Sequence, residues 1–384
     1  MRILLFTEQF PPLIGGAAHY LYNLLKRFRP KDIVVYTARR EGSLGFDRSQ
    51  KMKIIRGWIW GRPFWPPRIE SILGPFYLLV SLVRTVVREK ISVIYCGTVY
   101  PFAAYGLFFK VFFGIDYVVF TFAEEITILK KNKFKKIVIS FLFRHAQSVV
   151  SISDFAKREL MELKVPEERI NVIPAGVDPV QFSPQDVSGL KKELGLQGKK
   201  VILTLARLGE RKNQETVIRA LPKVLSRVSD AVYVIVGSGP TEERLKTLVK
   251  RLDLDEQVIF ISGVDHCLTP QYYNLCEVYI LPCRQIESTG DLEGFPLVFL
   301  EANSCAKPVI GGRAGGSQEA IVNGKTGFLL DDSLDHDEVA ETILRLLFDQ
   351  DLSLRMGQAG VARVKEFFTW DILAGRLKQV LGYQ

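Results

Sequence analysis

Short apolar runs rich in β-branched residues alternate along the chain with segments whose apolar residues recur at helical spacing. In the first half these runs predict strands at 2–6, 33–37, 93–96, 117–120, 148–152 and 171–173. In the second half they predict strands at 201–205, 232–236, 258–262, 278–281, 308–311 and 327–329. Helical patterns lie between them, for instance at 19–28, 155–163, 214–226 and 242–252. Strands that are almost wholly apolar and alternate with helices predict parallel sheets covered by helices on both faces.

The alternation occurs twice, on either side of a polar, turn-rich segment near residues 174–189. A chain of 384 residues is long for one domain and suits two. No repeat at a fixed short period is visible, which excludes a solenoid. The pattern therefore predicts an α/β protein of two doubly wound domains, residues 1–184 and 185–365.

Composition narrows the class of protein without naming a function. Apolar residues make up 47% and charged residues 24% of the chain, as in ordinary globular proteins, which excludes wholesale disorder. Five cysteines without a CxxC pair argue against a disulfide framework or a zinc ribbon and fit a reducing cytoplasm. The uncharged run 91–109 reaches membrane-spanning length, but it predicts a strand, a turn and a buried helix, so we expect no transmembrane segment. The first residues do not form a signal peptide.

Positive charge is concentrated in the first half. Residues 1–180 hold 27 Lys and Arg against 15 Asp and Glu, a net charge of +12, and the remainder has a net charge of −3. A basic domain of this kind indicates an anionic surface or substrate. No recognition helix or base-stacking motif points to nucleic acid, so an anionic membrane face or a phosphorylated ligand is favoured.

A segment near residue 60 combines aromatic and basic side chains, as at a lipid headgroup interface. Its members are Arg56, Trp58, Trp60, Arg62, Phe64, Trp65 and Arg68. The Lys-rich segment 130–136 would add attraction to an anionic surface. A proline-braced loop that packs its indoles on its own domain explains the first segment equally well. Peripheral attachment of the first domain to a membrane is therefore a hypothesis with one structural alternative.

Residues 291–301 read Asp-Leu-Glu-Gly-Phe-Pro-Leu-Val-Phe-Leu-Glu and carry the most chemistry. Gly294 lets the backbone approach a ligand closely, and Pro296 suits the first turn of a helix through 297–304. The N-terminus of such a helix is a site for anions such as a diphosphate. Glu293 and Glu301 are separated by roughly 12 Å of helical rise, too far for an acid/base pair. They could instead hold hydroxyl groups at two ends of one elongated ligand.

Two further loops follow predicted strands in this half. Arg207 and Lys212 lie after the strand at 201–205 and could grip a pyrophosphate and stabilise it as a leaving group. Gly237, in Val-Gly-Ser-Gly-Pro, allows close approach of a ligand at the next strand-to-helix turn. Each loop alone could be a solvated turn, but their order and spacing together indicate a site.

Four segments taken together resemble the retaining glycosyltransferases of family 4. They are the Gly15-Gly16 loop, IPAGVDPVQFSP at 173–184, LARLGERKN at 205–213, and the Glu-x7-Glu stretch that continues to GKTGFLL. The sequence is similar in particular to the bacterial mannosyltransferases that glycosylate phosphoinositides and related lipids. The resemblance implies the GT-B fold, two Rossmann-like domains facing across a cleft, with a C-terminal helix in 366–384 returning to the first domain.

The resemblance also implies roles for residues at the matching positions. Arg207 and Lys212 would bind the donor diphosphate, and Glu301 the ribose hydroxyls. The transferred sugar would be held by Glu293 and the backbone of Gly294, Phe295, Pro296 and Leu297. The remaining donor contacts would come from Gly15 and Gly16 at the diphosphate, Val264 beside the base, and Gly237. No metal or other cofactor is implied, because cations and a helix N-terminus replace it.

The sequence departs from the family pattern at residues 121–125, Thr-Phe-Ala-Glu-Glu. The family often has His-Gly-x-Glu there, and Phe122 stands in place of the active-site His. A phenyl ring cannot hydrogen-bond a sugar hydroxyl, so Glu124 or Glu125 supplies a polar group, the alignment is offset, or activity is weak. His19 could face the cleft, and a surface or capping role explains it equally well.

The expected activity is retaining transfer of a hexosyl group, with mannosyl as the leading candidate, from a GDP- or UDP-sugar. The acceptor would be a hydroxyl of a lipid, a lipid-linked sugar or an envelope glycan, and the enzyme would be cytoplasmic, with the membrane's inner face as a second location. Two alternatives remain: a non-catalytic nucleotide-sugar-binding partner in envelope assembly, which Phe122 favours, and a nucleotide-sugar epimerase of the same fold. The donor base, the sugar, the acceptor and the oligomeric state stay open.

Overall fold

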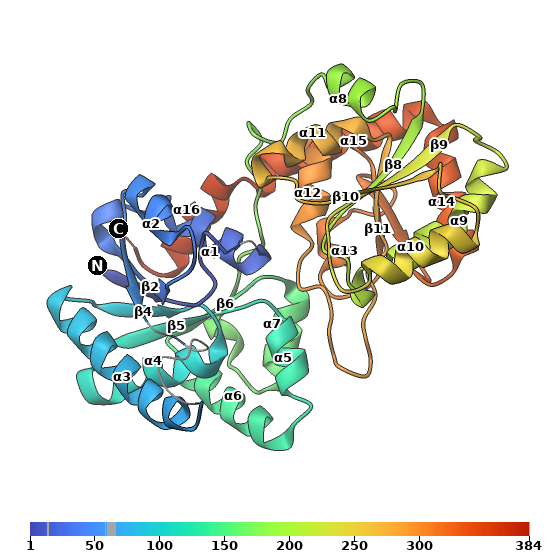
Figure 1. Cartoon of the computed structure of the whole chain (residues 1–384). Helices are drawn as coiled ribbons and strands as arrows, with labels where there is room; N and C mark the ends of the chain where they lie inside the picture. Colours follow the sequence, from blue (N-terminus) through green and yellow to red (C-terminus); the bar gives the residue numbers. More distant parts are fainter. Residues whose placement is uncertain (14, 58, 60–66, 384) are drawn as a thin grey trace. The chain divides into compact units, whose positions relative to one another are not determined.

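The computed structural model describes residues 1–13, 15–57, 59 and 67–383. Trp58, Trp60, Arg62, Phe64 and Trp65 of the aromatic and basic segment lie outside the described residues. The chain forms two compact units, Met1–Ala175 together with Trp370–Gln384, and Gly176–Thr369 (Figure 1). The first unit ends at Ala175, before the expected limit at 184, and the returning segment begins at Trp370 rather than at 366.

The first unit contains a parallel sheet of seven strands in the order β3-β2-β1-β4-β5-β6-β7. The strands are β1 (Ile3–Phe6), β2 (Ile33–Ala38), β3 (Lys53–Gly57), β4 (Val93–Cys96), β5 (Asp116–Thr121), β6 (Ser148–Ser151) and β7 (Ile170–Val172). Central β1 pairs on both sides, with Ile3 opposite Ile33 and Val93. The six predicted strands are confirmed, and the sequence missed β3. This edge strand is half-exposed and contains Lys53 and Arg56, so it lacks the apolar run that marks the others.

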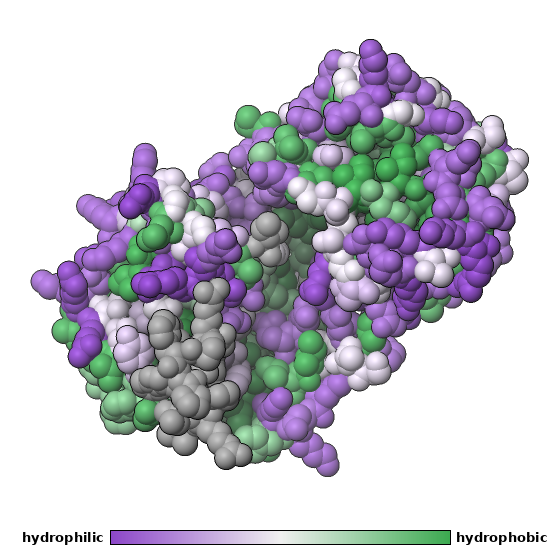
Figure 2. Space-filling model, viewed as in Figure 1, coloured by the Kyte–Doolittle hydropathy of each residue, from purple (hydrophilic) through white to green (hydrophobic). Residues whose placement is uncertain are grey.

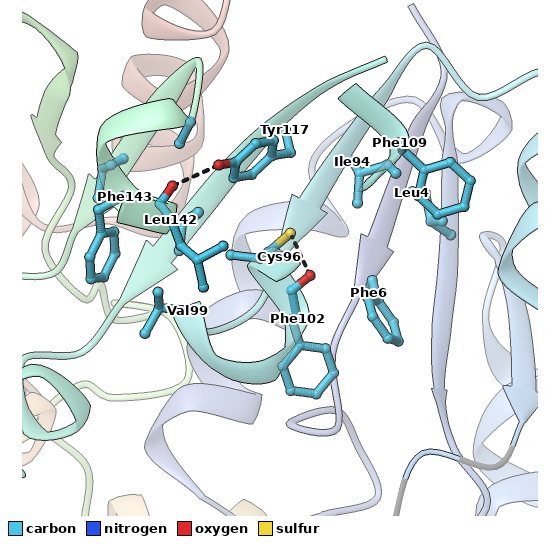
Figure 3. Close-up of a cluster of buried hydrophobic side chains, with 14 of the residues drawn as sticks. Leu4, Phe6, Ile94, Cys96, Val99, Phe102, Phe109, Tyr117, Leu142 and Phe143 are labelled. Atoms are coloured by element: carbon cyan, nitrogen blue, oxygen red, sulfur yellow. Dashed lines mark hydrogen bonds between the residues drawn. The ribbon is translucent and has the colours of Figure 1, made fainter. Parts of the chain in front are cut away.

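Helices cover both faces of this sheet. They are α1 (Gly16–Leu25), α2 (Ser43–Ser49), α3 (Pro67–Arg88), α4 (Ala104–Phe113), α5 (Glu124–Leu129), α6 (Lys133–His145), α7 (Asp154–Glu162) and α16 (Trp370–Val380). Helices α3, α4 and α6 pack on one face, where residues of alternate strand positions form the core. Figure 3 shows this core, with Tyr117 donating to the Leu142 carbonyl at 2.6 Å and the Cys96 thiol near the Phe102 carbonyl at 3.5 Å. Helix α16 packs against α1, although the two are far apart in sequence.

The second unit contains a parallel sheet of six strands in the order β10-β9-β8-β11-β12-β13. The strands are β8 (Lys200–Leu205), β9 (Ala231–Val236), β10 (Val258–Ile261), β11 (Val278–Leu281), β12 (Val309–Gly312) and β13 (Gly327–Leu330). The helices are α8 (Ser188–Glu193), α9 (Gln214–Leu225), α10 (Glu242–Arg251), α11 (Thr269–Leu275), α12 (Leu297–Ser304), α13 (Ser317–Ala320), α14 (His336–Phe348) and α15 (Gln350–Phe367). Helices α9, α10 and α14 share one core with the sheet, and α12 packs on α15. All six predicted strands are confirmed.

Both sheets have the doubly wound order in which successive strands add first to one side and then to the other. The order reverses between β1 and β4 in the first unit and between β8 and β11 in the second. Ligands of open α/β sheets bind at such reversal points, outside the carboxyl ends of the strands. Within the described part of the chain, no helix is long and apolar enough to cross a membrane.

Candidate active site

The reversal point of the second sheet gathers the charged residues that the sequence singled out. The loop after β8 carries Arg207 and leads into a short 3₁₀ turn (Glu210–Lys212) before α9. The loop after β11 carries Glu293 and leads into α12. Because β8 and β11 are hydrogen-bonded neighbours, both loops leave the same edge of the sheet side by side.

Four charged side chains from these two loops form one network. The Lys212 ammonium lies 2.5 Å from Oε2 of Glu293, and Nε of Arg211 lies 3.3 Å from the same oxygen. The guanidinium of Arg211 also contacts Asp291 at 2.5 Å. The sequence had predicted Lys212 and Glu293 as site residues, whereas it had assigned no role to Arg211 or Asp291.

The opposite charges of Lys212 and Glu293 keep both side chains ionised, although both are largely removed from solvent. Burial, the largest single effect, would lower the pKa of Lys212, but the charge of Glu293, its hydrogen bond and the interaction with Cys283 together outweigh it, and the pKa is raised. Burial would likewise raise the pKa of Glu293, but the charges of Lys212 and Arg211 outweigh it and the pKa is lowered. The site therefore presents a cation and a carboxylate together at neutral pH, each with only a small exposed fraction, 12% and 14%.

Backbone contacts hold the two loops together beneath this network. The amide of Arg284 donates to the carbonyl of Arg211 at 2.9 Å, and the Arg284 side chain donates to Glu210 at 2.8 Å. Within the second loop, Ile286 donates to the carbonyl of Asp291 at 2.9 Å and closes a turn. The charged side chains thus stand on a cross-linked pair of loops.

The loop that leads into α12 packs closely against Gly316. The amide of Gly316 donates to the Glu293 carbonyl at 3.0 Å, and a Cβ added at Gly316 would lie 2.0 Å from the Gly294 carbonyl oxygen. The ring of Phe295 is buried and stacks on Phe368, with centroids 6.1 Å apart. Phe295 therefore anchors the loop, while the backbone around Gly294 and the first residues of α12 remain the part suited to a ligand.

Glu301 lies deeper, one turn from the end of α12, and is only 4% exposed. Its Oε2 accepts a hydrogen bond of 2.6 Å from the hydroxyl of Tyr273, a buried residue of α11. Burial raises the pKa of Glu301 to about 7, and the hydrogen bond from Tyr273 opposes that rise. Tyr273 was missed from sequence because it is one of two adjacent tyrosines in a short helix of mixed polar and apolar residues, with no pattern that singles it out.

The remaining donor-site candidates of this unit occupy the same edge of the sheet. Arg207 is exposed, and Val264 is half-buried in the loop after β10. Gly237 has a positive φ of 143°, and a Cβ there would lie 2.1 Å from the carbonyl oxygen of Ala206. Residue 237 thus lies so close to the backbone of the neighbouring loop, at Ala206, that a glycine is needed there.

In the first unit, Gly15 ends the loop after β1 and Gly16 is the first residue of α1; both are exposed. Among the described residues, a Cβ added at either would meet no atom within 4 Å, so none of them explains these glycines by close packing. His19, on α1, is half-buried with its ring 5.6 Å from that of Trp370 on α16.

The turn after β5 contains Phe122, Ala123 and the two candidate carboxylates. Ala123 has φ 73° and ψ −48°, a region that L-residues seldom occupy. Glu125 accepts a 3.0 Å hydrogen bond from the amide of Phe122, and burial raises the pKa of Glu125. The Phe122 ring meets Tyr20 edge-on at 5.5 Å. The carboxyl group of Glu125 is therefore hydrogen-bonded to the backbone of the turn. Glu124 is the first residue of α5.

Within the described residues, no three His, Cys, Asp or Glu side chains are grouped so as to hold a metal ion.

Two protein families match this chain, each over one unit. The family described as Glycosyltransferase Family 4 matches residues 14–181, and the family described as Glycosyl transferases group 1 matches residues 188–363. The second match contains the charged network, Glu301 and the loops after β8 to β11.

Two curated relatives match over nearly their whole length. A GDP-mannose-dependent alpha-(1-6)-phosphatidylinositol monomannoside mannosyltransferase of Mycobacterium tuberculosis is 29% identical, over 99% of this chain and 98% of the relative. A related monoacylated-substrate enzyme of Corynebacterium glutamicum is 28% identical, over 99% and 97%. Among solved structures, Anabaena HepE in complex with UDP and glucose superposes with a TM-score of 0.82 at 21% identity, over the whole of both chains.

Proposed function

The chain belongs to the family 4 glycosyltransferases, and from this premise we propose that it transfers a mannosyl group from GDP-mannose to a hydroxyl of a phosphoinositide-type glycolipid. The transfer would proceed with retention of configuration at the anomeric carbon. The names of the full-length relatives support the donor and the acceptor class. A UDP-sugar is the second candidate donor, and a lipid-linked sugar or envelope glycan the second candidate acceptor.

The observation that carries the proposal is the buried pair of Lys212 and Glu293 at the reversal point of the second sheet. A cation held next to a helix N-terminus suits the charge that develops on a departing diphosphate. A carboxylate beside it suits hydroxyl groups of the transferred sugar. Glu301, eight positions along, would accept hydrogen bonds from the ribose hydroxyls.

The reaction needs no protein nucleophile in this proposal. The bond between the anomeric carbon and the diphosphate oxygen breaks, and the acceptor oxygen bonds to the same face of that carbon. The proton of the acceptor hydroxyl passes to the departing phosphate oxygen, so the products are the glycoside and the nucleoside diphosphate. Arg207 and Lys212 lower the barrier by stabilising the leaving group. These cations also support a reaction without a divalent metal or other cofactor.

We further propose that the enzyme works at the inner face of the cytoplasmic membrane, where a lipid acceptor is embedded. The net charge of +12 over residues 1–180 supports this location, because such a surface is anionic.

Calorimetric titration with GDP, UDP and ADP, followed by transfer assays, tests the proposal. We expect GDP to bind in the micromolar range, binding to be lost in Glu301→Ala, and the matching donor to yield a mannosylated lipid. Binding without hydrolysis or transfer would favour the non-catalytic alternative that Phe122 raises. Turnover of the donor without an acceptor to a different sugar nucleotide would favour an epimerase. No binding of any nucleotide would refute the donor site itself.

A further inference from the structure

Helix α6 of the first unit has apolar side chains on two sides, one facing the core and one facing outward. Its inward side buries Ile139, Leu142 and Phe143 in the core. Its outward side carries a second apolar stripe, whose side chains are exposed and not buried in the core. Phe134 is 74% exposed, Ile137 68% and Phe141 49%. Their spacing of three and four residues places all three on one side of the helix.

Further exposed apolar side chains lie at the C-terminal end of α4, next to that of α6. The ammonium of Lys110, in the last turn of α4, donates to the carbonyl of His145 at 3.1 Å, so the C-terminal ends of α4 and α6 lie together. Val111 and Phe112, which follow Lys110, are 67% and 70% exposed. Large side chains at this level of exposure are costly in water and mark a contact surface when they are grouped. Figure 2 shows hydrophobic residues bordered by hydrophilic ones on the visible face of this unit.

Basic residues of α6 flank the stripe, and the helix itself contains no acidic residue. The α6 sequence, Lys-Phe-Lys-Lys-Ile-Val-Ile-Ser-Phe-Leu-Phe-Arg-His, contains no Asp or Glu. Lys133, Lys135, Lys136 and Arg144 are all exposed. A protein partner or a second copy of this chain would have to bring matching carboxylates, and a second copy presents this same basic face. A lipid bilayer with anionic headgroups provides both an apolar interior and a negative surface.

We propose that the α4–α6 face, meaning Val111, Phe112, Phe134, Ile137 and Phe141 with the flanking basic residues, docks on an anionic lipid membrane. The helix lies along the interface with the apolar stripe among the acyl chains and the lysines at the headgroups. The inference assigns the membrane contact to described residues of α6 and α4, outside the aromatic segment near residue 60. It extends the location proposed above, but it requires no transferase activity.

Vesicle co-sedimentation of the full chain tests the surface. The wild type should bind vesicles of phosphatidylcholine with phosphatidylglycerol and bind pure phosphatidylcholine weakly, and high salt should reduce the binding. The triple variant Phe134→Ser, Ile137→Ser, Phe141→Ser should bind the anionic vesicles about tenfold more weakly or worse. The variant Lys133→Gln, Lys135→Gln, Lys136→Gln should lose the preference for anionic lipid.

The matched control is Leu44→Ser with Val87→Ser. Leu44 on α2 and Val87 on α3 are exposed to a similar degree in the same unit, at 76% and 64%, but lie on other helices. The control should bind vesicles as the wild type does. If the triple variant and the wild type bind anionic vesicles equally, the α4–α6 face is not the docking surface. If the wild type binds no vesicles, the proposal of membrane docking is wrong.

Two further measurements separate the other outcomes. If the wild type is dimeric and the triple variant monomeric, the face is an interface between copies of this chain and the proposal is wrong. GDP binding is measured on every variant, because it depends on the second unit. Loss of vesicle binding with GDP binding intact is a membrane effect, whereas absence of GDP binding in the wild type would refute the donor site and leave docking unaffected.

Discussion

Lys212 and Glu293 illustrate how a functional charge is kept inside a protein. Each side chain is largely buried, and each neutralises the other across 2.5 Å. Removing one partner of such a pair leaves the other buried without compensation, which destabilises the fold as well as the reaction. An experiment on this pair must therefore separate catalysis from stability.

We expect Lys212→Ala to lower kcat by about 10²- to 10³-fold, a barrier increase of about 3 kcal/mol, as for loss of one donor to a developing oxyanion. Turnover is measured at saturating donor, with thermal unfolding to show that the variant is folded at the assay temperature. The matched control is Lys223→Ala, a half-exposed lysine of the same unit paired with Asp337 and Glu341. Near-normal turnover of Lys212→Ala would contradict the leaving-group role.

Glu301 makes both stability and binding depend on pH. Its pKa in the folded chain is about 7, above the ordinary value of 4.5. The folded state therefore holds a proton that the unfolded chain has released between these two pH values, and stability falls as pH rises through that window. A shift of this size corresponds to about 3 kcal/mol. Tyr273 lies against the carboxyl from α11, with Tyr279 and Cys305 as the other titratable neighbours.

Ribose hydroxyls donate stronger hydrogen bonds to an ionised carboxylate than to a protonated carboxyl group, so nucleotide affinity should rise as pH increases through about 7. Tyr273→Phe removes the hydrogen bond that favours ionisation, and we expect the midpoint of that rise to move to higher pH. Calorimetric Kd values for GDP between pH 6 and 8.5 measure the shift. Tyr272→Phe, next to it but without a contact to Glu301, should keep the wild-type profile. An unchanged midpoint in Tyr273→Phe would remove Tyr273 as a positioning residue.

At the scale of elements, the turn into α5 is held in an unfavourable conformation. Ala123 occupies φ 73° and ψ −48°, and the Glu125 carboxylate binds the amide of Phe122 just before it. Backbone strain of this kind is typical of functional sites, where the surrounding structure holds it in place. Glu125 is the group that does so here.

Ala123→Gly should stabilise the first unit by about 1 kcal/mol, because glycine adopts positive φ without a steric penalty. Glu125→Gln should destabilise it, and Ala123→Gly should restore part of the loss in the double variant. Denaturant unfolding measures all three. Ala156→Gly, in the first turn of α7, is the opposite control and should be destabilising by about 1 kcal/mol. Destabilisation by Ala123→Gly would show that the alanine side chain contributes more than the strain costs.

The elements themselves were largely predictable, and the contacts between side chains were not. Strands such as β4 and β11 are buried on both faces, so they stand out as apolar runs and both were predicted to the residue. Strand β3 was missed because an edge strand can be half-exposed and charged. The contacts of Arg211 with Asp291 and of Tyr273 with Glu301 join residues 80 and 28 positions apart. The spacing of apolar residues along the chain cannot predict such a contact, because the contact depends on which loops the sheet brings together.

At the scale of the whole molecule, charge and chemistry are divided between the two units. The excess of positive charge and the α4–α6 face belong to the first, whereas Lys212, Glu293 and Glu301 all belong to the second. A nucleotide that binds the second unit stabilises the folded form of that unit by mass action, by about 2.7 kcal/mol at a concentration 100 times its Kd.

Hydrogen exchange followed by mass spectrometry can resolve this division. With saturating GDP we expect amides of β8, β11 and α12 to exchange more slowly, whereas the core strands of the first unit, such as β4 and β5, should be unchanged. Glu301→Ala at the same nucleotide concentration is the control and should lose this protection. Protection spread evenly over the first sheet would show instead that the nucleotide stabilises both units together, so that the donor site could not be assigned to the second unit alone.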